Sequence, residues 1–148
     1  RNGWGLWGRS PAIGISFVAW QKLWRVAGID HLHCNGLGNK FCEPDDSVIA
    51  SARACLTPIF DPPGKGCEVM PVFSSGQTVR QVPATYDALG STELIFAAGG
   101  GIMAHPGGIG AGVRSLRQAW QAAVDGVPLE EYASAHAELR AALGRFQV

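Results

Sequence analysis

The segment ELIFAAGGGIMAHPGG, residues 93–108, passes from an apolar run into three consecutive glycines. Residues 93–98 are predicted to form a strand, because short runs rich in Ile and Phe and bounded by glycine are typical of buried strands. Glycine has no Cβ, so residues 99–101 allow the backbone of the following loop to approach a partner closely. The segment therefore predicts a buried strand that ends in a glycine-rich loop.

Two earlier segments have the same organisation. Residues 29–34 lead into the loop NGLGNKF, and residues 68–73 (EVMPVF) lead into SSGQT. Apolar periodicity, capping residues and prolines predict helices over residues 10–28, 48–56, 83–89, 108–124 and 129–146. Alternating helices and strands require parallel strands joined by right-handed crossovers, which predicts an α/β fold. Because the carboxyl ends of parallel strands share one edge, the three loops are expected to lie side by side.

The composition narrows the class of partner. The 148 residues carry 12 basic and 12 acidic side chains with no block of like charge, which argues against binding to nucleic acid or to an anionic membrane. No apolar segment approaches the roughly 20 residues needed to cross a bilayer. The spacing of Cys34, Cys42, Cys55 and Cys67 fits neither a zinc knuckle nor a secreted disulfide framework. We therefore expect reduced thiols, a cytoplasmic location and a small-molecule ligand.

Two of the three loops have the character of a phosphate site. In (β/α)8 barrels the loops after the seventh and eighth strands commonly hold a phosphate through backbone N–H groups. Ser74-Ser75-Gly76 and Gly99-Gly100-Gly101 form such a pair at consecutive strand ends. The alternative is that these glycines only make tight turns.

His31, His33 and Lys40 are the candidates in the first loop region. The two histidines lie two apart on a strand, so both rings project from the same face, where they could ligate zinc, bind an anion or pack. We favour an anion or substrate role for at least one of them. Lys40 stands in a glycine-rich loop that could swing over a ligand and stabilise a developing oxyanion or carboxylate, although a solvated surface lysine is the alternative.

The motifs together carry a family resemblance. DHLHCNGLGNK, MPVFSSGQT and GGGIMAHPGGIGAGVRSLRQA, preceded by RNGWG, resemble the C-terminal half of the catalytic barrel of ribulose-1,5-bisphosphate carboxylase/oxygenase (RuBisCO), and more closely that of the RuBisCO-like proteins. The resemblance covers essentially the whole chain and implies that its strands are strands 6–8 of a (β/α)8 TIM barrel. Residues 1–148 are then the C-terminal portion of this barrel. The N-terminal domain and strands 1–5 are expected to be absent from the chain, which begins at Arg1 rather than at a methionine.

The resemblance implies catalytic roles in the first loop. Arg1 matches an arginine that binds one substrate phosphate, and His33 matches a histidine that works beside it. Lys40 matches the lysine that closes over the substrate and stabilises a new carboxylate. His33 and Lys40 are therefore the expected catalytic residues.

The other two loops are expected to bind phosphate. Ser74 and Gly76 match the serine and the second glycine of a Ser-Gly-Gly motif, and Gly99 and Gly100 match a pair whose amides hold the second phosphate. This chain departs from the motif at Ser75, where the family has glycine, and at residues 77–78, where Gln-Thr replaces Ile-His. The loop GLGNKF also lacks the Thr-Val-Val-Gly-Lys pattern of true carboxylases. These departures count against carboxylation and are compatible with enolisation.

The resemblance implies a cofactor and partners outside this chain. In the family, Mg²⁺ is bound by a carbamylated lysine with a neighbouring aspartate and glutamate on the second strand, and no such motif occurs in residues 1–148. No metal ligand is therefore expected here, and the isolated chain is expected to be inactive. The family's active site also takes groups from a partner subunit, which implies a homodimer or a higher oligomer.

The leading hypothesis is a RuBisCO-like, Mg²⁺-dependent enolisation of a phosphorylated keto-sugar or thio-sugar, of the enolase, isomerase or decarboxylase type. Three alternatives stay open. One is a true ribulose-bisphosphate carboxylase, the second a zinc hydrolase barrel that uses His31 and His33, and the third a phosphate-binding barrel without catalysis.

Overall fold

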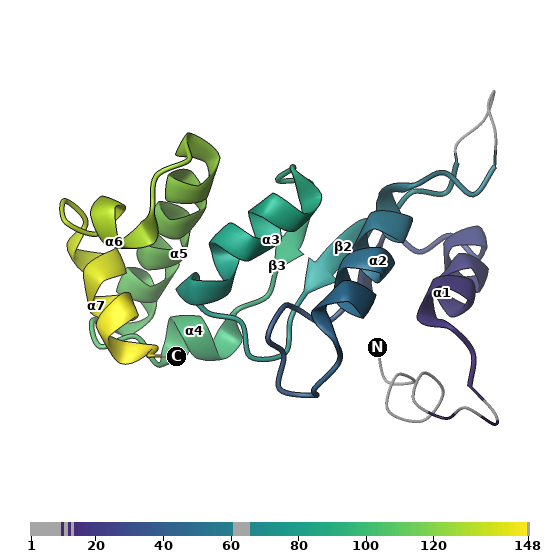
Figure 1. Cartoon of the computed structure of the whole chain (residues 1–148), viewed down its shortest axis with the longest axis horizontal. Coiled ribbons are helices and arrows are strands. Elements are labelled where there is room, and N and C mark those ends of the chain that lie inside the picture. Colours follow the sequence, from purple (N-terminus) through teal and green to yellow (C-terminus); the bar gives the residue numbers. More distant parts are fainter. Residues whose placement is uncertain (1–9, 11, 13, 61–65, 148) are drawn as a thin grey trace.

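The computed structural model describes residues 10, 12, 14–60 and 66–147. Three short strands form one parallel sheet in the order β1-β2-β3, with β1 at His31–His33, β2 at Met70–Phe73 and β3 at Ile95–Phe96. In the register of the sheet, His33 pairs with Val72, which in turn pairs with Ile95. The α/β fold with parallel strands is therefore confirmed, and Figure 1 shows helices following each strand.

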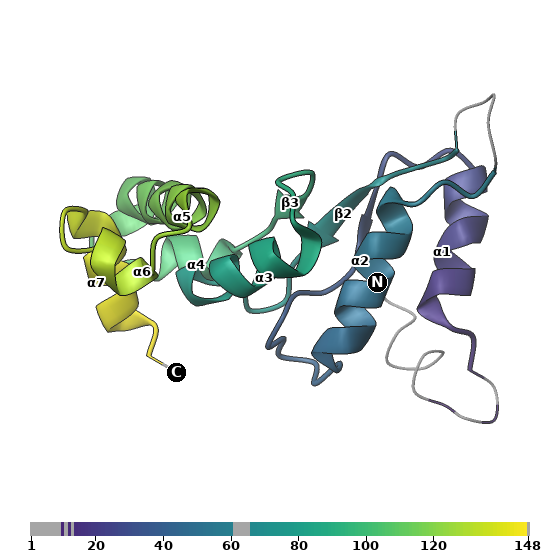
Figure 2. The same cartoon turned by 45° about the horizontal axis from the view of Figure 1, so that its top comes forward.

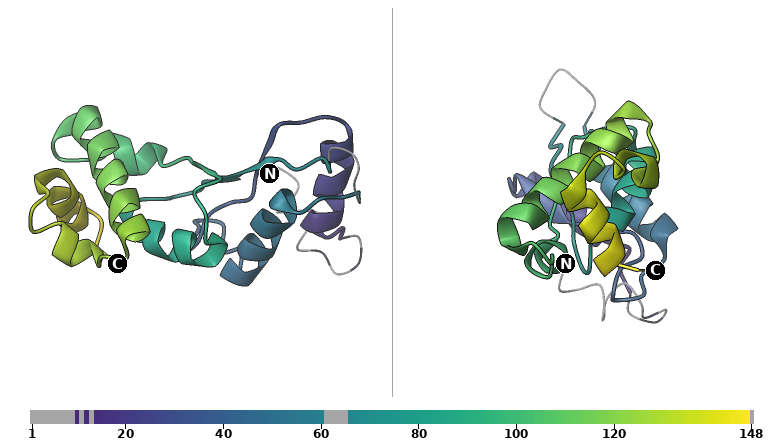
Figure 3. Two further views of the ribbon diagram at one scale, coloured as in Figure 1. Left: turned by 90° about the horizontal axis from the view of Figure 1, so that it is seen from above. Right: turned by 90° about the vertical axis from the view of Figure 1, so that its left-hand side faces the viewer.

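Helices cover one face of the sheet. Alternate residues of the strands, including Leu32 and Phe73, pack with α2 (Asp45–Leu56) in an apolar cluster that also contains Val48 and Cys55. The left panel of Figure 3 shows the strands along one side of the molecule, with α2 and α3 (Val82–Leu89) along the other.

The opposite face of the sheet is open. It presents the exposed side chains of His31, His33, Met70 and Ile95, and between them Val72, which is buried. This is the face that points toward the barrel interior in a (β/α)8 fold, where side chains from alternate strands pack in layers.

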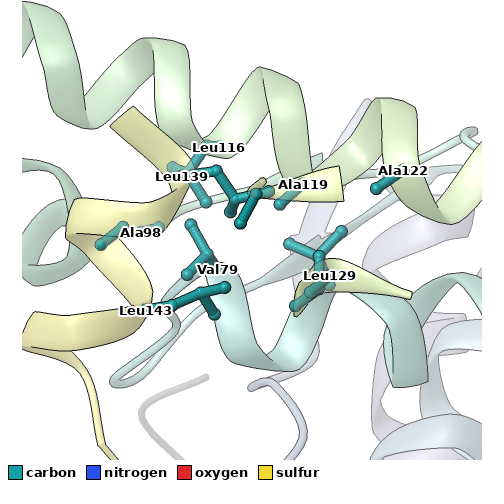
Figure 4. Packing of buried hydrophobic residues seen from close by; sticks show 11 residues of the cluster. Val79, Ala98, Leu116, Ala119, Ala122, Leu129, Leu139 and Leu143 are labelled. Carbon is teal, nitrogen blue, oxygen red and sulfur yellow. The ribbon is translucent and has the colours of Figure 1, made fainter. Parts of the chain in front are cut away.

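A second apolar cluster lies at the C-terminal end of the chain. It joins α5 (Gly108–Asp125), α6 (Leu129–Tyr132) and α7 (Ala137–Arg145) to Val79 of the short 3₁₀ helix η2 (Val79–Gln81). Figure 4 shows Leu116, Leu139 and Leu143 converging on Val79. Figure 2 shows this group at one end of the molecule and α1 (Phe17–Val26), beside α2, at the other.

The first helix differs from its prediction. It begins at Phe17, where the Ser16 hydroxyl accepts a hydrogen bond from the Ala19 amide at 3.1 Å, and not after Ser10. Helical periodicity predicts that Trp24 lies on one apolar stripe with Phe17 and Trp20 and faces the core, but the residue is 47% exposed.

The buried side chains of α1 are polar. They are Gln21 and Arg25, and the Arg25 guanidinium donates to the carbonyls of Ala54, Thr57 and Cys67. Arg25 therefore binds carbonyls in and just after the last turn of α2, where helix carbonyls lack the full set of intrahelical amide donors.

The predicted helix over residues 129–146 is divided into α6 and α7. The break lies at His136, whose ring stacks on Tyr132 with centroids 4.0 Å apart and whose Nδ1 lies 2.7 Å from the Tyr132 carbonyl. The other helices agree closely with the prediction: α2 ends just before Pro58, and α3 ends at Gly90, which has φ 63°.

The helix α4 (Gly99–Met103) was not predicted, because three successive glycines have a low helix propensity. Tertiary contact explains it. A Cβ at Gly101 would lie 2.7 Å from the Gln77 carbonyl oxygen, and one at Gly112 of α5 would lie 2.3 Å from the Ile102 carbonyl oxygen. Glycines at these two positions allow α4 to pack directly on neighbouring backbone. Within the part of the chain that the structure describes, no helix has the length and apolar character needed to cross a membrane.

Candidate substrate-binding site at the strand ends

The loops that follow the three strands lie next to one another, as predicted. The Lys40 amide donates to the Ser75 carbonyl at 3.1 Å, which joins the loop after β1 to the loop after β2. The Ala97 amide donates to the Phe73 carbonyl at 2.7 Å, which holds the end of β3 against the end of β2. The close approach of Gly101 to Gln77 continues this contact beyond the strands. The sequence-predicted residues of the three loops therefore belong to one edge of the sheet.

His33 lies on the open face of the sheet at the end of β1. Its Nδ1 is 3.1 Å from the Ser74 hydroxyl oxygen, so the predicted catalytic histidine and the predicted phosphate-binding serine are in direct contact. Burial lowers the pKa of His33 below its usual 6.5, and the neighbouring His31 lowers it further. His33 is therefore mainly neutral at pH 7.

Lys40 is presented by a loop with extensive internal hydrogen bonding. The buried Asn39 side chain donates to the carbonyls of Gly36 and Glu43 and accepts from the amides of Phe41 and Glu43. The Lys40 ammonium lies over the Phe41 ring, 5.3 Å from its centroid. The sequence suggested a loop free to swing, whereas these contacts fix the backbone on both sides of Lys40.

The loop after β2 turns sharply through two left-handed residues, Ser75 with φ 74° and Gly76 with φ 98°. A Cβ at Gly76 would lie 3.8 Å from the Lys40 Cβ and from its amide nitrogen, so Gly76 lies directly against the lysine loop. Ser75 is not glycine, so its left-handed conformation is strained. Its hydroxyl donates to the Asn35 Oδ1 atom at 2.9 Å.

Residues 99–101 have two different structural roles. Gly101 is buried against the backbone of Gln77 and Thr78, whereas a Cβ at Gly99 or Gly100 would meet nothing within 4 Å. Neither Gly99 nor Gly100 has a positive φ. Backbone conformation and packing within the described residues therefore explain the glycine at 101 but not those at 99 and 100. The latter pair forms the exposed first turn of α4.

Sequence reasoning missed Asn35, Glu43 and Gln77. Asn35 has φ 61°, which the dipeptide Asn35-Gly36 could have indicated, since such pairs favour left-handed turns. Glu43 and Gln77 gave no local signal, because their partners are distant in sequence or depend on the loop conformation. Gln77 is buried, and its Nε2 donates to the Leu37 carbonyl at 3.0 Å.

Other predicted features lie apart from these contacts. Arg1 is outside the described residues. His105 is buried, and it accepts from the Gly107 amide through Nδ1 and contacts the Glu138 carbonyl through Nε2, so it orders the segment between α4 and α5. A cavity of about 300 Å³ lined by residues such as Leu94 and Trp120 lies near the start of β3 and includes no predicted site residue.

Magnesium or zinc would need several ligands within reach. Within residues 10, 12, 14–60 and 66–147, no group of three or more His, Cys, Asp or Glu side chains could hold a metal ion. His31 and His33 therefore lack the further ligands that a zinc site requires among the described residues. The described residues also do not fit a family-type Mg²⁺ site.

Comparison with known proteins gives the family. Residues 1–146 match the model of the ribulose bisphosphate carboxylase large chain, catalytic domain. The chain is 54% identical over 144 residues to a 3-oxo-isoapionate-4-phosphate transcarboxylase/hydrolase of Xanthobacter autotrophicus, with 97% of this chain and 34% of that protein covered. It is 47% identical over 147 residues to a 3-oxo-isoapionate-4-phosphate decarboxylase of Rhizobium etli, with 99% and 34% covered.

Among solved structures, a RuBisCO-like protein from Burkholderia fungorum has a TM-score of 0.92 and 53% identity, with 99% of this chain and 36% of that chain covered. The chain thus spans about a third of the length of the proteins it matches. Its three parallel strands and their helices correspond to part of the RuBisCO catalytic barrel. The chain belongs to the ribulose bisphosphate carboxylase large-chain family.

Proposed function

We propose that this chain is the C-terminal portion of a RuBisCO-like enzyme that acts on a phosphorylated keto-sugar acid, with decarboxylation as the favoured reaction. The observation that carries the proposal is the meeting of the β1 and β2 loops, where His33 contacts Ser74 and the Lys40 amide binds the Ser75 carbonyl. Two relatives whose names include 3-oxo-isoapionate-4-phosphate support this class of substrate.

The chemistry requires stabilisation of negative charge next to a ketone. Loss of CO₂ from a 3-oxo acid leaves its electron pair on the adjacent carbon, from which it delocalises onto the ketone oxygen as an enolate. An ammonium held near that oxygen stabilises the enolate more than it stabilises the neutral ketone, and so lowers the barrier. We assign this role to Lys40, because Asn39 orders the loop around it and the Lys40 amide holds that loop against the Ser75 carbonyl.

Phosphate recognition is assigned to the two other loops. Gly99 and Gly100 begin α4, and the first amides of a helix have no intrahelical acceptor and can bind an anion. Neither residue needs to be glycine for its backbone conformation or for its packing, and this supports the assignment. The backbone amides of Ser74 and Gly76 are assigned to the same ligand, and Arg1 to a second phosphate or a carboxylate of the substrate.

Magnesium, where the enzyme uses it, would supply electrostatic stabilisation of the enolate. Because the described residues do not fit such a site, we propose that the metal ligands, including a carbamylated lysine, belong to other parts of the full-length protein. We also propose a homodimer or higher oligomer and a cytoplasmic location. The latter is supported by the four cysteines, Cys34, Cys42, Cys55 and Cys67, none of which forms a disulfide.

The test uses the full-length protein with Mg²⁺ and bicarbonate. CO₂ release from 3-oxo-isoapionate 4-phosphate, and exchange of solvent deuterium into phosphorylated ketoses, are measured by gas analysis and NMR. The variant Lys40→Ala is expected to lower kcat by about 100-fold, in the range seen when one stabilising group for a developing oxyanion is removed. Lys22→Ala, which removes an exposed lysine of α1, is the matched control and should leave kcat unchanged.

The outcomes separate the alternatives. Carboxylation of ribulose bisphosphate would establish a true carboxylase instead. Phosphate binding without turnover or proton exchange on any of these compounds, unaffected by Lys40→Ala, would establish a non-catalytic barrel. Stoichiometric zinc that is lost in His31→Ala would restore the zinc hydrolase hypothesis.

A further inference from the structure

A continuous line of polar side chains joins a buried carboxylate to His33. Glu43 is 3% exposed, and its Oε2 atom accepts a hydrogen bond from the Asn35 Nδ2 atom at 2.6 Å. The Ser75 hydroxyl lies 2.9 Å from the Asn35 Oδ1 atom and 3.3 Å from the Ser74 hydroxyl. Ser74 in turn lies 3.1 Å from the His33 Nδ1 atom.

The chemistry of the groups determines the direction of each hydrogen bond. A carboxylate only accepts, so the Asn35 amide must present its NH₂ group to Glu43 and its oxygen to Ser75. A hydroxyl has one proton, and the proton of Ser75 is used on the Asn35 oxygen. In the 3.3 Å contact between the two hydroxyls, Ser74 is therefore the only possible donor. The single proton of Ser74 is then also used, and its oxygen can only accept from His33.

We propose that Glu43, Asn35 and Ser75, acting through Ser74, hold neutral His33 in the tautomer that carries its proton on Nδ1. In this tautomer Nε2 has a lone pair and accepts a hydrogen bond. His33 then serves as an acceptor for a substrate hydroxyl, and not as a neutral donor to a phosphate dianion. Asn35 and Ser75 are positioning residues, because they act through Ser74. The statement that the donor is a substrate hydroxyl rests on the proposed function, whereas the assignment of the tautomer does not.

The backbone at Ser75 supports a role for its hydroxyl. A non-glycine residue at φ 74° is strained, and glycine would adopt this conformation without strain. Glycine has no hydroxyl, however, and would leave a gap in the line between Asn35 and Ser74. Burial lowers the pKa of His33 and so favours its neutral form, which is the form that has two tautomers. The strained serine is thus explained by the hydrogen bond it provides.

The test measures the tautomer directly in full-length protein labelled with ¹⁵N-histidine. Two-bond ¹⁵N–¹H correlation spectra at about pH 8, above the usual histidine pKa, report which ring nitrogen carries the proton. The His33 signals are assigned by their loss in His33→Gln. The wild type is expected to show the Nδ1–H form, and Ser75→Gly, which suits the left-handed backbone, is expected to move the population toward Nε2–H. The kcat of this variant should fall about tenfold, as for other supporting hydrogen-bond partners of a reactive side chain.

The matched control is Ser47→Ala. Ser47 donates to the other Glu43 oxygen, Oε1, at 2.8 Å and lies outside the line to His33, so its removal should leave the tautomer unchanged. Thermal melting verifies that Ser75→Gly is folded, and Ser74→Ala provides a second break in the line. A wild-type Nε2–H form, or a tautomer unchanged in both variants, would overturn the inference. Absence of turnover with the Nδ1–H form intact would refute the proposed function alone.

Discussion

Alanine substitution at the three glycines of α4 separates a packing role from a ligand role. In Gly101→Ala the new Cβ would lie 2.7 Å from the Gln77 carbonyl oxygen and 3.1 Å from the Thr78 Cα. Both atoms belong to the backbone, so α4 or the β2 loop must shift. Overpacking of this kind costs about 1–3 kcal/mol, and the better helix propensity of alanine recovers up to about 1 kcal/mol. The expected net loss is about 1–2 kcal/mol.

Gly99→Ala and Gly100→Ala should behave in the opposite way. A Cβ at either position meets nothing within 4 Å, and neither residue has a positive φ, so stability should stay the same or rise slightly. If the amides of this turn bind phosphate, however, the methyl group would hold the anion away. Loss of one hydrogen bond to a charged group is worth about 1.5 kcal/mol or more, which corresponds to roughly tenfold weaker binding.

The assay combines thermal melting of the full-length protein with calorimetric titration of inorganic phosphate. Gly101→Ala should lower Tm by about 3–6 °C, given that 1 kcal/mol shifts the Tm of a large domain by about 2–4 °C. Gly100→Ala should keep Tm and lose phosphate affinity. A wild-type Tm for Gly101→Ala would refute the packing argument. Wild-type phosphate affinity in both Gly99→Ala and Gly100→Ala would refute the ligand argument.

Three further predictions concern stability. Gly36→Ala places a Cβ within 2.4 Å of the far end of the Gln77 side chain, which must turn away and give up its hydrogen bond to the Leu37 carbonyl, so the expected cost is about 1–2 kcal/mol in the free energy of unfolding. Most of this cost should disappear in the Gln77→Ala background, and equal costs in both backgrounds in urea titrations would contradict the contact. Arg25→Met leaves the carbonyls of Ala54, Thr57 and Cys67 without their charged donor and should lower the unfolding free energy by about 3 kcal/mol, whereas the exposed Arg117→Met should have little effect. Hydrogen bonds from Gln118 and then Arg114 lower the pKa of Glu138 from 4.5 to about 2. The contribution of Glu138 to stability is therefore complete above about pH 4.5 and is lost as the pH falls toward 2. The difference in Tm between wild type and Glu138→Gln should shrink over this range of pH, and a difference independent of pH would contradict the prediction.

Local signals explain which helices were predicted well. Gly90 ends α3 in a left-handed conformation, and Pro58 stops α2, because each acts through its own backbone. The start of α1 was predicted wrongly because Ser10 and Ser16 are both good capping residues. Sequence alone does not show which serine precedes the turn that packs on α2.

Non-local contacts explain the remaining differences. The periodicity of α1 suggested that Trp24 is buried, but the carbonyls at the end of α2 require a donor, and Arg25 provides it. The helix α4 exists because Gly101 and Gly112 allow backbone to pack on backbone. At the site, the order of the strands alone predicted which edge of the sheet is the candidate site. This edge contains His33, Lys40, Ser74, Gly76, Gly99 and Gly100. The sequence did not predict Glu43 or Asn35, since their roles depend on how the loops pack.

The site loops and the helices are held by different kinds of contact. The helices pack through apolar clusters, whereas the β1 and β2 loops are joined by the hydrogen bonds of Ser75 to Asn35 and of Gln77 to the Leu37 carbonyl. A single hydrogen bond contributes only about 1 kcal/mol net, so exchange of one of these polar side chains changes the geometry or protonation of the site without unfolding the protein. A glycine at position 75 would preserve the left-handed turn and remove only the hydroxyl. Under the proposed tautomer, exchange of these loop residues would alter the proton on His33, whereas the apolar clusters would keep the strands in place.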